Sequence, residues 1–414
     1  MGEETKSNIF VARQPIFLRS QKVYAYELLF RSGLENFFDP AQDGEQATSK
    51  VITSTFLLIG LPKLTGGKKA FINFTEEMLL KGYATLFPRK ETVVEVLESV
   101  AASPAVAKAC EGLARKNYVL ALDDFLYEER FIPLLKLARI VKFDIRQMSL
   151  AELSRQVRIV KEYNVKLLAE KIETIDEFAV CKKLGFDLFQ GYFFSRPKVV
   201  EGHDIPGSKL QYLRMLRLVQ DENYDFEKLA ELISRDVSLA YKLLKYVNSA
   251  YFARMREVSS LQEAVAMLGE INLRKWLSLM MLSYMADDKP SELLRLATLR
   301  GAFCELVAAR LLGKAADAGK YHTVGIFSLL PAMLDKPMAE IVGELSLPAE
   351  IKDALLGGQE GSLLGGVLSL AEAYERGEWE PVSALAASLG ISNEELPWLY
   401  ESALDSLQGF DFPD

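Results

Sequence analysis

The first half of the chain alternates between two patterns of hydrophobic and polar positions. Short runs rich in Val, Ile, Phe and Tyr are separated by stretches in which apolar residues recur every three or four positions. The short runs predict β-strands, and the stretches between them, such as "PAVAKACEGLARKN", predict amphipathic helices. The runs that predict strands are "NIFVARQPIF", "KVYAYELLF", "KKAFINFT", "ETVVEVLE", "YVLALDDF", "RIVKFDIR", "VKLLAEKI" and "FDLFQGYFF".

The spacing of these runs predicts the topology of the sheet. The second run follows the first too closely for a crossover helix, so the two are expected to form a hairpin. The remaining runs are typical of repeated βα units, which place a parallel sheet inside and helices outside. We therefore predict an α/β barrel of the (β/α)8 type with one antiparallel strand. An open doubly wound sheet is the alternative, but the chain lacks a glycine-rich first turn and has polar residues after nearly every strand.

The second half of the chain has a helical pattern almost throughout, as in "SLAYKLLKYVNSAYF" and "ELLRLATLRGAFCELVAARLL". Before it, the stretch "PKVVEGHDIPGSK" contains two prolines and two glycines and is typical of a linker. A chain of 414 residues is long enough for more than one hydrophobic core. The pattern predicts a barrel domain over residues 1–197, a linker over 198–208 and an all-α domain over 209–414.

Charge and composition narrow the range of partners and locations. The formal net charge of −8 argues against a non-specific nucleic-acid binder. No apolar run approaches the roughly 20 residues that span a bilayer, and the N-terminus has no apolar signal segment. The three cysteines are far apart, which fits a reducing compartment. We expect a cytoplasmic protein with no nucleic-acid partner and no membrane association.

Polar side chains lie near the carboxyl ends of nearly all the predicted strands. In a barrel these ends meet at one mouth, where ligands bind. A single acid in such a place usually faces water or caps the next helix, but a polar group at almost every strand end indicates a shared site. These residues are Glu27, Asn73, Glu95, Glu98, Asp123, Asp124, Lys142, Glu170, Glu173 and Gln190.

The residue types in this set point to a metal centre. Buried acids raise one another's pKa values and are unstable together without cations. Oxygen ligands in a chain with only two histidines favour the hard ions Mg²⁺ and Mn²⁺. Asp123 is placed to bridge two ions about 3.5–4 Å apart, the spacing used in two-metal phosphodiester hydrolysis. Lys142, a cation among the acids, could orient a water molecule or a phosphate oxygen.

The same residues carry a resemblance to a known family. The ordered motifs "RQPIF", "YELLFR", "FINFTE", "VEVLE", "LDDF", "VKFD", "AEKIE" and "FQGYFFSRP" cover residues 8–197 and resemble the EAL domain. EAL domains hydrolyse the bacterial second messenger cyclic di-GMP to linear pGpG. The helical half resembles an HDOD domain, a relative of HD phosphohydrolases without their metal ligands, in "LLKYVNSAYF", "SLQEAVAMLGEINLRKW" and "TVGIFSLLPAML". The order EAL then HDOD is similar to a bacterial two-domain signalling family.

The resemblance implies a cofactor and its ligands. The cofactor is a pair of Mg²⁺ or Mn²⁺ ions, with Asp123 shared between them. The implied metal ligands are Glu27, Asn73, Glu95, Asp123, Asp124 and Glu173.

The resemblance also implies catalytic and ligand-binding residues. It makes Lys142 the residue that positions water and Glu170 the general base. It places Gln14, Arg31 and Gln190 at ligand-binding positions, with Arg31 able to pair with a phosphate of the dinucleotide.

Two departures from the family pattern leave the function open. The alanine that gives the family its name is Leu28, and the family's "DDFGTGYSS" is "DDFLYEERF" here. In active members that glycine-rich loop supports the metal-bound glutamates and helps to form a dimer. Leu126 and Tyr127 do not reach the positive φ angles of glycine at low cost.

Three interpretations of the function follow from this pattern. In the first, the barrel binds cyclic di-GMP and hydrolyses it with Mg²⁺ or Mn²⁺, and the HDOD domain regulates it. In the second, a degenerate EAL domain serves as an inactive cyclic di-GMP receptor or as a scaffold for other proteins. A phosphodiesterase for another phosphodiester is the third. The first two expect a protein partner at the helical domain, and a homodimer is compatible with both.

Overall fold

The computed structural model describes residues 9–32, 60–197, 207–221, 224–249, 258, 260–313, 318–345, 347–357 and 362–407. The chain divides into two compact units. The first comprises Met1–Phe193, Ala373–Ser383 and Asn393–Pro397, and the second comprises Phe194–Glu372, Ala384–Ser392 and Trp398–Asp414. Most of the predicted linker lies outside the described residues, so its boundaries stay a prediction.

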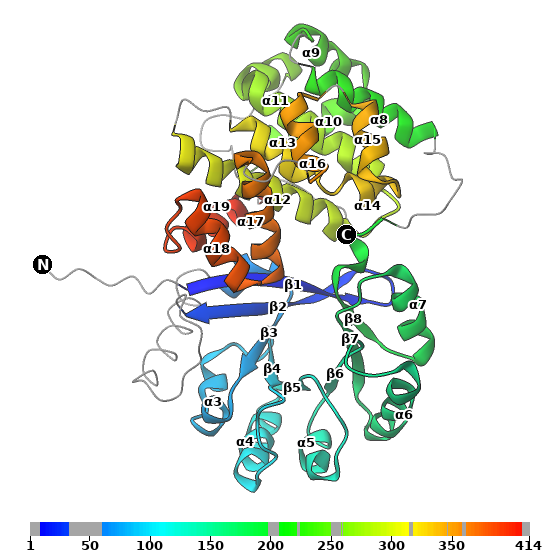
Figure 1. Cartoon of the computed structure of the whole chain (residues 1–414), viewed down its shortest axis with the longest axis vertical. Helices are drawn as coiled ribbons and strands as arrows, with labels where there is room; N and C mark the ends of the chain where they lie inside the picture. The colour runs from blue at the N-terminus through cyan, green and yellow to red at the C-terminus, as the bar shows by residue number, and fades with distance from the viewer. Residues whose placement is uncertain are drawn as a thin grey trace, which may run out of the picture. The chain divides into compact units, whose positions relative to one another are not determined.

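The strands of the first unit form a closed barrel in sequence order (Figure 1). The first strand, β1, pairs antiparallel with both β2 and β8, and the other neighbouring strands pair parallel. The prediction of a (β/α)8-like barrel with one antiparallel strand is confirmed, and the open sheet is excluded by the closure. The strands are β1 (Ile9–Leu18), β2 (Val23–Ser32), β3 (Lys69–Phe74), β4 (Thr92–Val96), β5 (Val119–Leu122), β6 (Ile140–Asp144), β7 (Lys166–Glu170) and β8 (Leu188–Gln190).

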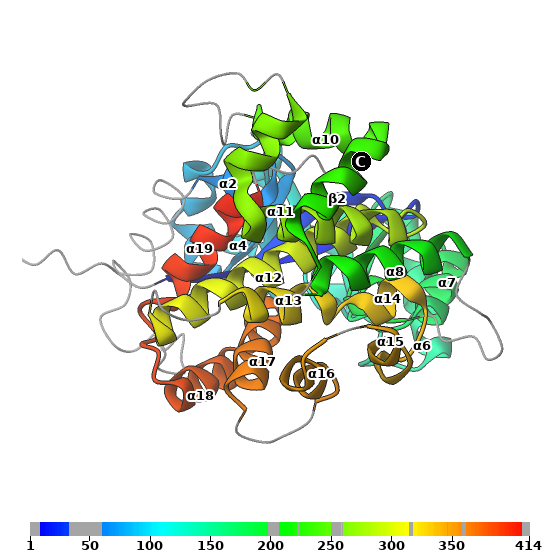
Figure 2. The same ribbon diagram turned by 90° about the horizontal axis from the view of Figure 1, so that it is seen from above.

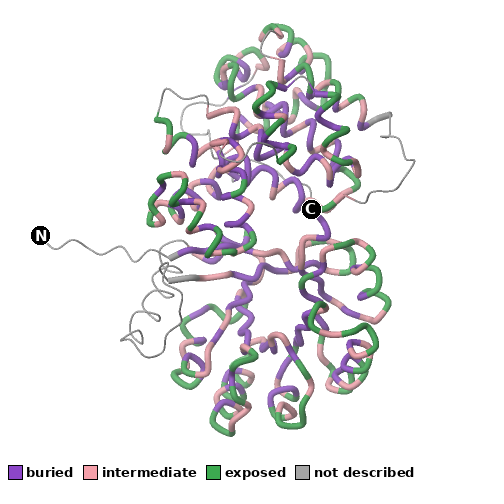
Figure 3. Tube along the Cα trace, viewed as in Figure 1, coloured by how far each residue is buried: buried purple, intermediate pink, exposed green. Residues whose placement is uncertain are grey.

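A layer of apolar side chains fills the barrel, with one residue from each strand. All of these side chains are buried, and Figure 3 shows the burial along the strands while the outer helices carry exposed positions. Because side chains alternate along a strand, the residue two positions away on each strand faces the same interior. The apolar layer consists of Ile16, Ala25, Phe71, Val93, Ala121, Ile140, Leu168 and Leu188.

Helices follow the parallel strands, and several begin at side-chain caps. The Ser103 hydroxyl accepts a hydrogen bond from the Val106 amide, and Thr174 forms a capping box with Glu177. These caps fix where each helix leaves the barrel. The helices of this region are α2 (Leu61–Thr65), α3 (Glu76–Leu80), α4 (Pro104–Arg115), α5 (Ile132–Leu135), α6 (Leu150–Val160) and α7 (Ile175–Leu184).

The rest of the described chain is helical, as the pattern predicted. The helices are α8 (Gly207–Gln220), α9 (Phe226–Arg235), α10 (Val237–Val247), α11 (Leu261–Met285), α12 (Ser291–Leu312), α13 (Gly319–Phe327), α14 (Leu330–Leu334), α15 (Met338–Glu344), α16 (Ala349–Leu355), α17 (Leu363–Arg376), α18 (Trp379–Leu389) and α19 (Leu396–Ser406). Among the described residues, no helix combines the length and apolar character needed to cross a membrane.

The helices α12 and α13 lie side by side in both views (Figures 1 and 2). They approach closely because a glycine faces a glycine: a Cβ atom on Gly325 would lie 2.7 Å from the Gly301 Cα atom and 2.8 Å from the Arg300 carbonyl oxygen. Real Cβ atoms do not come this close to backbone, so the contact requires glycine.

Gly325→Ala is therefore expected to destabilise the helical unit by about 1–3 kcal/mol, because the helices must move apart. Gly343→Ala is the matched control, since Gly343 lies in helix α15 with open space around its Cβ position. That control should leave stability unchanged or raise it by up to about 1 kcal/mol. Urea unfolding of both variants measures the difference, and equal stability would contradict the close helix contact.

Candidate active site

Next to the apolar layer lies a second layer of eight polar residues, one within each strand except Asp123, which directly follows β5. Each of these residues is two positions from the apolar residue of the same strand, so both face the barrel interior. In the β1–β2 hairpin, Gln14 lies opposite Glu27. Between β1 and β8, Ile16 lies opposite Gln190. The polar layer consists of Gln14, Glu27, Asn73, Glu95, Asp123, Lys142, Glu170 and Gln190.

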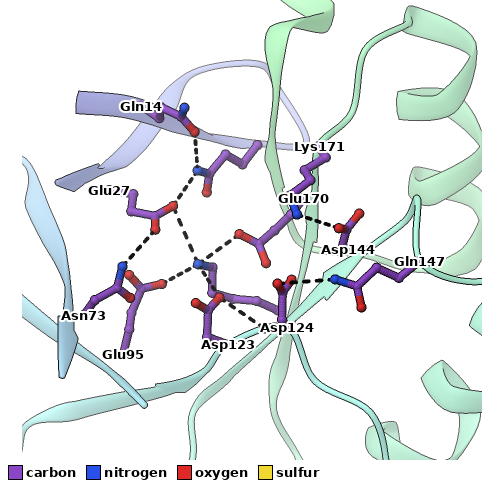
Figure 4. Close-up of polar contacts among 12 residues, drawn as sticks. Gln14, Glu27, Asn73, Glu95, Asp123, Asp124, Asp144, Gln147, Glu170 and Lys171 are labelled. Atoms are coloured by element: carbon purple, nitrogen blue, oxygen red, sulfur yellow. Dashed lines mark hydrogen bonds and ion pairs between the residues drawn. The ribbon is translucent and has the colours of Figure 1, made fainter. Parts of the chain in front are cut away.

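The Lys142 ammonium group lies among four acids of this layer, and Figure 4 labels these acids, Glu27, Glu95, Asp123 and Glu170. Its Nζ atom lies 2.7 Å from Glu95 Oε1, 2.7 Å from Asp123 Oδ1 and 2.9 Å from Glu170 Oε1. Glu27 Oε2 is 3.6 Å away. Only 1% of the lysine side chain is exposed, so four carboxylates share one buried cation. If all four were ionised, the cluster would carry a net charge of −3.

The pKa values of the cluster follow from this arrangement. Burial raises the pKa of Glu170 to about 8 and the pKa of Glu95 well above its ordinary value, although Lys142 opposes both shifts. Burial alone would lower the pKa of Lys142, but the four surrounding carboxylates outweigh it and raise that pKa well above its ordinary value. The raised pKa values of Glu95 and Glu170 favour the protonated forms of these two carboxyl groups.

Asp123 and Asp124 follow β5, where the chain turns sharply. Asp124 has a φ angle of 39°, a left-handed conformation that is uncommon for a residue with a side chain. The Asp124 amide donates a hydrogen bond to Asp123 Oδ1 over 3.1 Å. One oxygen each of Asp123, Asp124 and Glu170 lies within 4.8 Å of the others. Burial and the neighbouring Asp123 carboxylate raise the pKa of Asp124. This turn therefore brings three carboxylates close enough to share a cation.

Polar residues beyond the predicted set surround Asp124. Gln147 Nε2 donates to Asp124 Oδ2 over 3.4 Å. The Lys171 ammonium group bonds to Asp144 Oδ2 over 2.6 Å, and both charges act on the pKa of Asp124. Lys171 also has a left-handed φ of 57°. These three residues are not among those predicted from the sequence, although Asp144 and Lys171 lie within the motifs "VKFD" and "AEKIE".

Several buried oxygen atoms in the layer have no hydrogen-bond partner among the described residues. They are Asn73 Oδ1, Glu95 Oε2, Glu170 Oε2 and Gln190 Oε1. Such an atom costs about 1–3 kcal/mol when it is left unpaired. All are hard oxygen donors, and three belong to residues predicted as metal ligands or as the base. The site therefore fits divalent ions such as Mg²⁺ or Mn²⁺.

Two predicted site residues do not join the described cluster. The Glu173 carboxylate is 43% exposed and pairs with Arg146 over 3.4 Å. Arg31 belongs to β2, but its side chain is outside the described part of the structure. Their roles as metal ligand and phosphate contact stay predictions.

The loop after Asp124 is anchored without glycine. The Phe125 ring is buried and packs edge-on against Phe131 and Phe143. The Tyr127 amide donates to Gln156 Oε1 over 3.0 Å. None of the residues from Phe125 to Phe131 has a positive φ angle, and the left-handed residue of this turn is Asp124. A cavity of about 310 Å³ lies between this loop and the end of β4, with Asp123 and Asp124 in its wall.

Family models match the two halves of the chain. The EAL domain matches residues 66–197 and the HDOD domain matches residues 205–342. Both resemblances drawn from the motifs are thus confirmed.

Two relatives share nearly the whole length of the chain. The uncharacterized protein YuxH of Bacillus subtilis (strain 168) is 36% identical over 411 residues, 97% of each chain. The cyclic di-GMP phosphodiesterase CdgJ of Vibrio cholerae is 35% identical over 399 residues, which is 95% of this chain and 91% of CdgJ.

Among solved structures, a calcium and cy-diGMP complex of Klebsiella pneumoniae BlrP1 is similar over 48% of this chain and 58% of that chain, with 21% identity and a TM-score of 0.38. The matched domains and the full-length relatives decide the family: the chain belongs to the two-domain proteins in which an EAL domain is followed by an HDOD domain.

Proposed function

We propose that this protein takes part in cyclic di-GMP signalling and that its barrel binds the dinucleotide and hydrolyses it to pGpG with two divalent ions. The observation that carries the proposal is the polar layer, in which the buried Glu27, Glu95 and Glu170 and the partly buried Asp123 share one lysine. Several oxygens of this layer have no hydrogen-bond partner among the described residues. The name of the relative CdgJ, a cyclic di-GMP phosphodiesterase that aligns over 95% of this chain and 91% of its own length, supports the choice of substrate.

The metal ions would neutralise the carboxylates, polarise the phosphodiester and lower the pKa of a bound water. The residues proposed to hold them come from β2, β3, β4, the end of β5 and the loop after β7. They are Glu27, Asn73, Glu95, Asp123, Asp124 and Glu173.

Lys142 and Glu170 are the proposed catalytic residues. The Lys142 ammonium group is held at hydrogen-bond distance from Glu95, Asp123 and Glu170 and keeps its charge, so it can orient a water or a phosphate oxygen. A base works best with a pKa near the working pH, and burial raises the pKa of Glu170 to about 8. Glu170 can therefore accept the proton of the attacking water.

The substrate contacts and the setting of the protein complete the proposal. Gln14, Arg31 and Gln190 are proposed to contact the dinucleotide, with Arg31 pairing with a phosphate. We propose that the HDOD domain binds a regulatory protein partner. We also propose that the protein acts in the cytoplasm and forms a homodimer.

A non-catalytic cyclic di-GMP receptor is the second candidate. The observation that favours it is the glycine-free loop after Asp124, which is anchored by Phe125 and by the bond from Tyr127 to Gln156. When the residues that support metal ligands change, the ligands are placed less precisely, and metal affinity and turnover decrease.

One experiment separates these candidates. The protein is incubated with cyclic di-GMP and Mn²⁺ or Mg²⁺, and pGpG is followed by chromatography, with Glu27→Ala as the control. In parallel, cyclic di-GMP binding is titrated with Ca²⁺. We expect pGpG from the wild type and none from the variant. Binding without product would make the protein a receptor, and neither binding nor product would contradict the proposal.

A further inference from the structure

A C-terminal segment of the chain belongs to the barrel unit. Residues Ala373–Ser383 include the end of α17, the turn at Gly377 and the start of α18, and they cluster with the strands. They lie beyond residue 342, where the HDOD match ends, and far from the EAL match. Neither domain resemblance accounts for them.

Aromatic rings fix this segment to β1. The Phe10 ring lies 5.6 Å from the Trp379 ring and 6.4 Å from the Tyr374 ring, measured between centroids, and Tyr374 and Trp379 are 5.4 Å apart. Phe10 and Tyr374 are buried. Beside them the turn touches β2, because a Cβ atom on Gly377 would lie 2.7 Å from Leu29 Cδ1. The segment therefore has a defined position on the hairpin.

Hydrogen bonds lead from this segment to a proposed metal ligand. Gln14 Nε2 donates to the Arg376 carbonyl oxygen over 3.2 Å and to the Tyr192 hydroxyl over 3.4 Å. The Tyr192 hydroxyl in turn donates to the Glu375 carbonyl oxygen over 3.1 Å. Gln14 Oε1 accepts from Gln190 Nε2 over 3.0 Å, and the same Gln190 nitrogen donates to Glu27 Oε2 over 2.6 Å. Figure 4 shows the hydrogen bonds that lead from Gln14 to Glu27.

The direction of these bonds is fixed by the segment. A backbone carbonyl only accepts, so Arg376 requires the amide nitrogen of Gln14 to face it. The Gln14 oxygen must then face Gln190, which presents its own nitrogen to both Gln14 and Glu27. If Gln14 were reversed, two amide nitrogens would meet and the bond to Gln190 would be lost. The orientation of the Gln190 side chain, and with it the placement of Glu27 Oε2, depends on where the segment lies.

We infer that Ala373–Ser383 is a positioning element for the metal ligand Glu27, acting through Gln14 and Gln190, so that displacing this segment weakens metal binding in the barrel. The inference rests on the proposed function, because it requires Glu27 to bind a metal ion. It also makes the segment a route by which the C-terminal part of the chain regulates the barrel. Because coupling is reciprocal, metal bound at Glu27 must also hold the segment more firmly.

A matched pair of glycine variants tests the inference in the full-length chain. Gly377 and Gly390 both have positive φ angles, of 67° and 73°, but only Gly377 has a neighbour within 4 Å of its Cβ position. Gly377→Ala should weaken Mn²⁺ binding about 3- to 10-fold, below the 10–100-fold typical of direct partners of a ligand. Gly390→Ala carries the same backbone strain and should leave the Mn²⁺ affinity unchanged. Equal affinities of the two variants would overturn the inference.

A second pair keeps the test independent of folding defects at the turn. Tyr192→Phe removes the hydroxyl that bonds to Glu375 and Gln14, while Tyr118→Phe removes a comparable bond to the Phe87 carbonyl oxygen on the same barrel. Only Tyr192→Phe should weaken Mn²⁺ binding, and equal affinities of this pair would count against the inference.

Hydrogen exchange gives a readout that does not depend on activity. Adding Mn²⁺ to the wild type should slow amide exchange in Ala373–Ser383, and this protection should shrink in Gly377→Ala. A wild type that binds Mn²⁺ without protecting the segment would overturn the inference alone. A wild type that binds no Mn²⁺ would overturn the proposed function and the inference with it.

Discussion

Replacing Lys142 with Met should greatly slow turnover and destabilise the metal-free protein. The ammonium group is the buried cation shared by Glu27, Glu95, Asp123 and Glu170. Removing one partner of a buried ion pair leaves uncompensated charge, which costs about 3–5 kcal/mol. The cost should be largest at pH values above about 8, where Glu170 loses its proton. Turnover should fall about 10²–10⁴-fold, because a positioned proton-transfer or orienting group is lost.

Metal ions should reverse the loss of stability but not the loss of turnover. Mn²⁺ can replace the missing positive charge, and a ligand that binds only the folded state stabilises it. Lys171→Met is the control, because Lys171 also pairs with an acid at the barrel mouth but its side chain is 57% exposed. It should lower stability less than Lys142→Met does, because the loss removes one largely exposed cation from a single buried acid, Asp144. Urea unfolding with and without Mn²⁺ measures the stability of both variants, and pGpG formation measures their turnover. A Lys142→Met protein as stable as the Lys171→Met control without metal would contradict the account of the cluster.

The affinity for Mn²⁺ should rise steeply with pH up to about pH 8. Burial raises the pKa of Glu170 to about 8, so this carboxyl group is protonated at neutral pH in the metal-free protein. A divalent ion held by the neighbouring Asp123 and Asp124 would favour the ionised form of Glu170, so binding should release the proton. Each proton released makes the affinity increase about tenfold per pH unit below the pKa, and the increase should level off above it.

Glu170→Gln provides the control for this pH dependence. The amide keeps the shape of the side chain but does not titrate, so the slope should become shallower by about one proton; the raised pKa of Glu95 leaves a remaining slope. Calorimetry between pH 6 and 9 gives the affinity, and repeating it in buffers of different ionisation enthalpy counts the protons. A wild-type affinity that does not change with pH would contradict the raised pKa values.

The sequence predicted the barrel and most of its site because both depend on short-range periodicity. The side chains of Ala121 and Asp123, or of Ile140 and Lys142, share a face because strands repeat every two residues. Closing the barrel then gathers one polar residue from each strand in a single layer. The family motifs added Gln14, which no local pattern marks as part of a site. The structure confirms that the side chains of the polar layer are neighbours, while their chemical roles stay predictions.

Other features depend on turns that the pattern does not encode. Gln147 and Lys171 lie past strand ends, where the chain direction decides which side chains face Asp124. The expectation for the loop after Asp124 rested on the difficulty of positive φ angles at Leu126 and Tyr127. Neither residue adopts one, because Asp124 makes the left-handed turn instead.

The C-terminal segment illustrates a further limit of sequence patterns. Trp379 packs against Phe10 although more than 360 positions separate them in the chain. Its helical periodicity is the same as that of the helices in the second unit, so no local signal distinguishes it. Only the folded chain reveals that it belongs with the barrel.

If the acids around Lys142 form a two-metal centre, as we propose, the protein must bind two divalent ions per chain. The full-length protein is titrated with Mn²⁺ near pH 8, and free Mn²⁺ is followed by electron paramagnetic resonance, with Asp123→Ala measured alongside. We expect two Mn²⁺ ions per wild-type chain and the loss of tight binding when the proposed shared ligand Asp123 is removed. No tight Mn²⁺ binding by the wild type, or the same binding by Asp123→Ala, would contradict it.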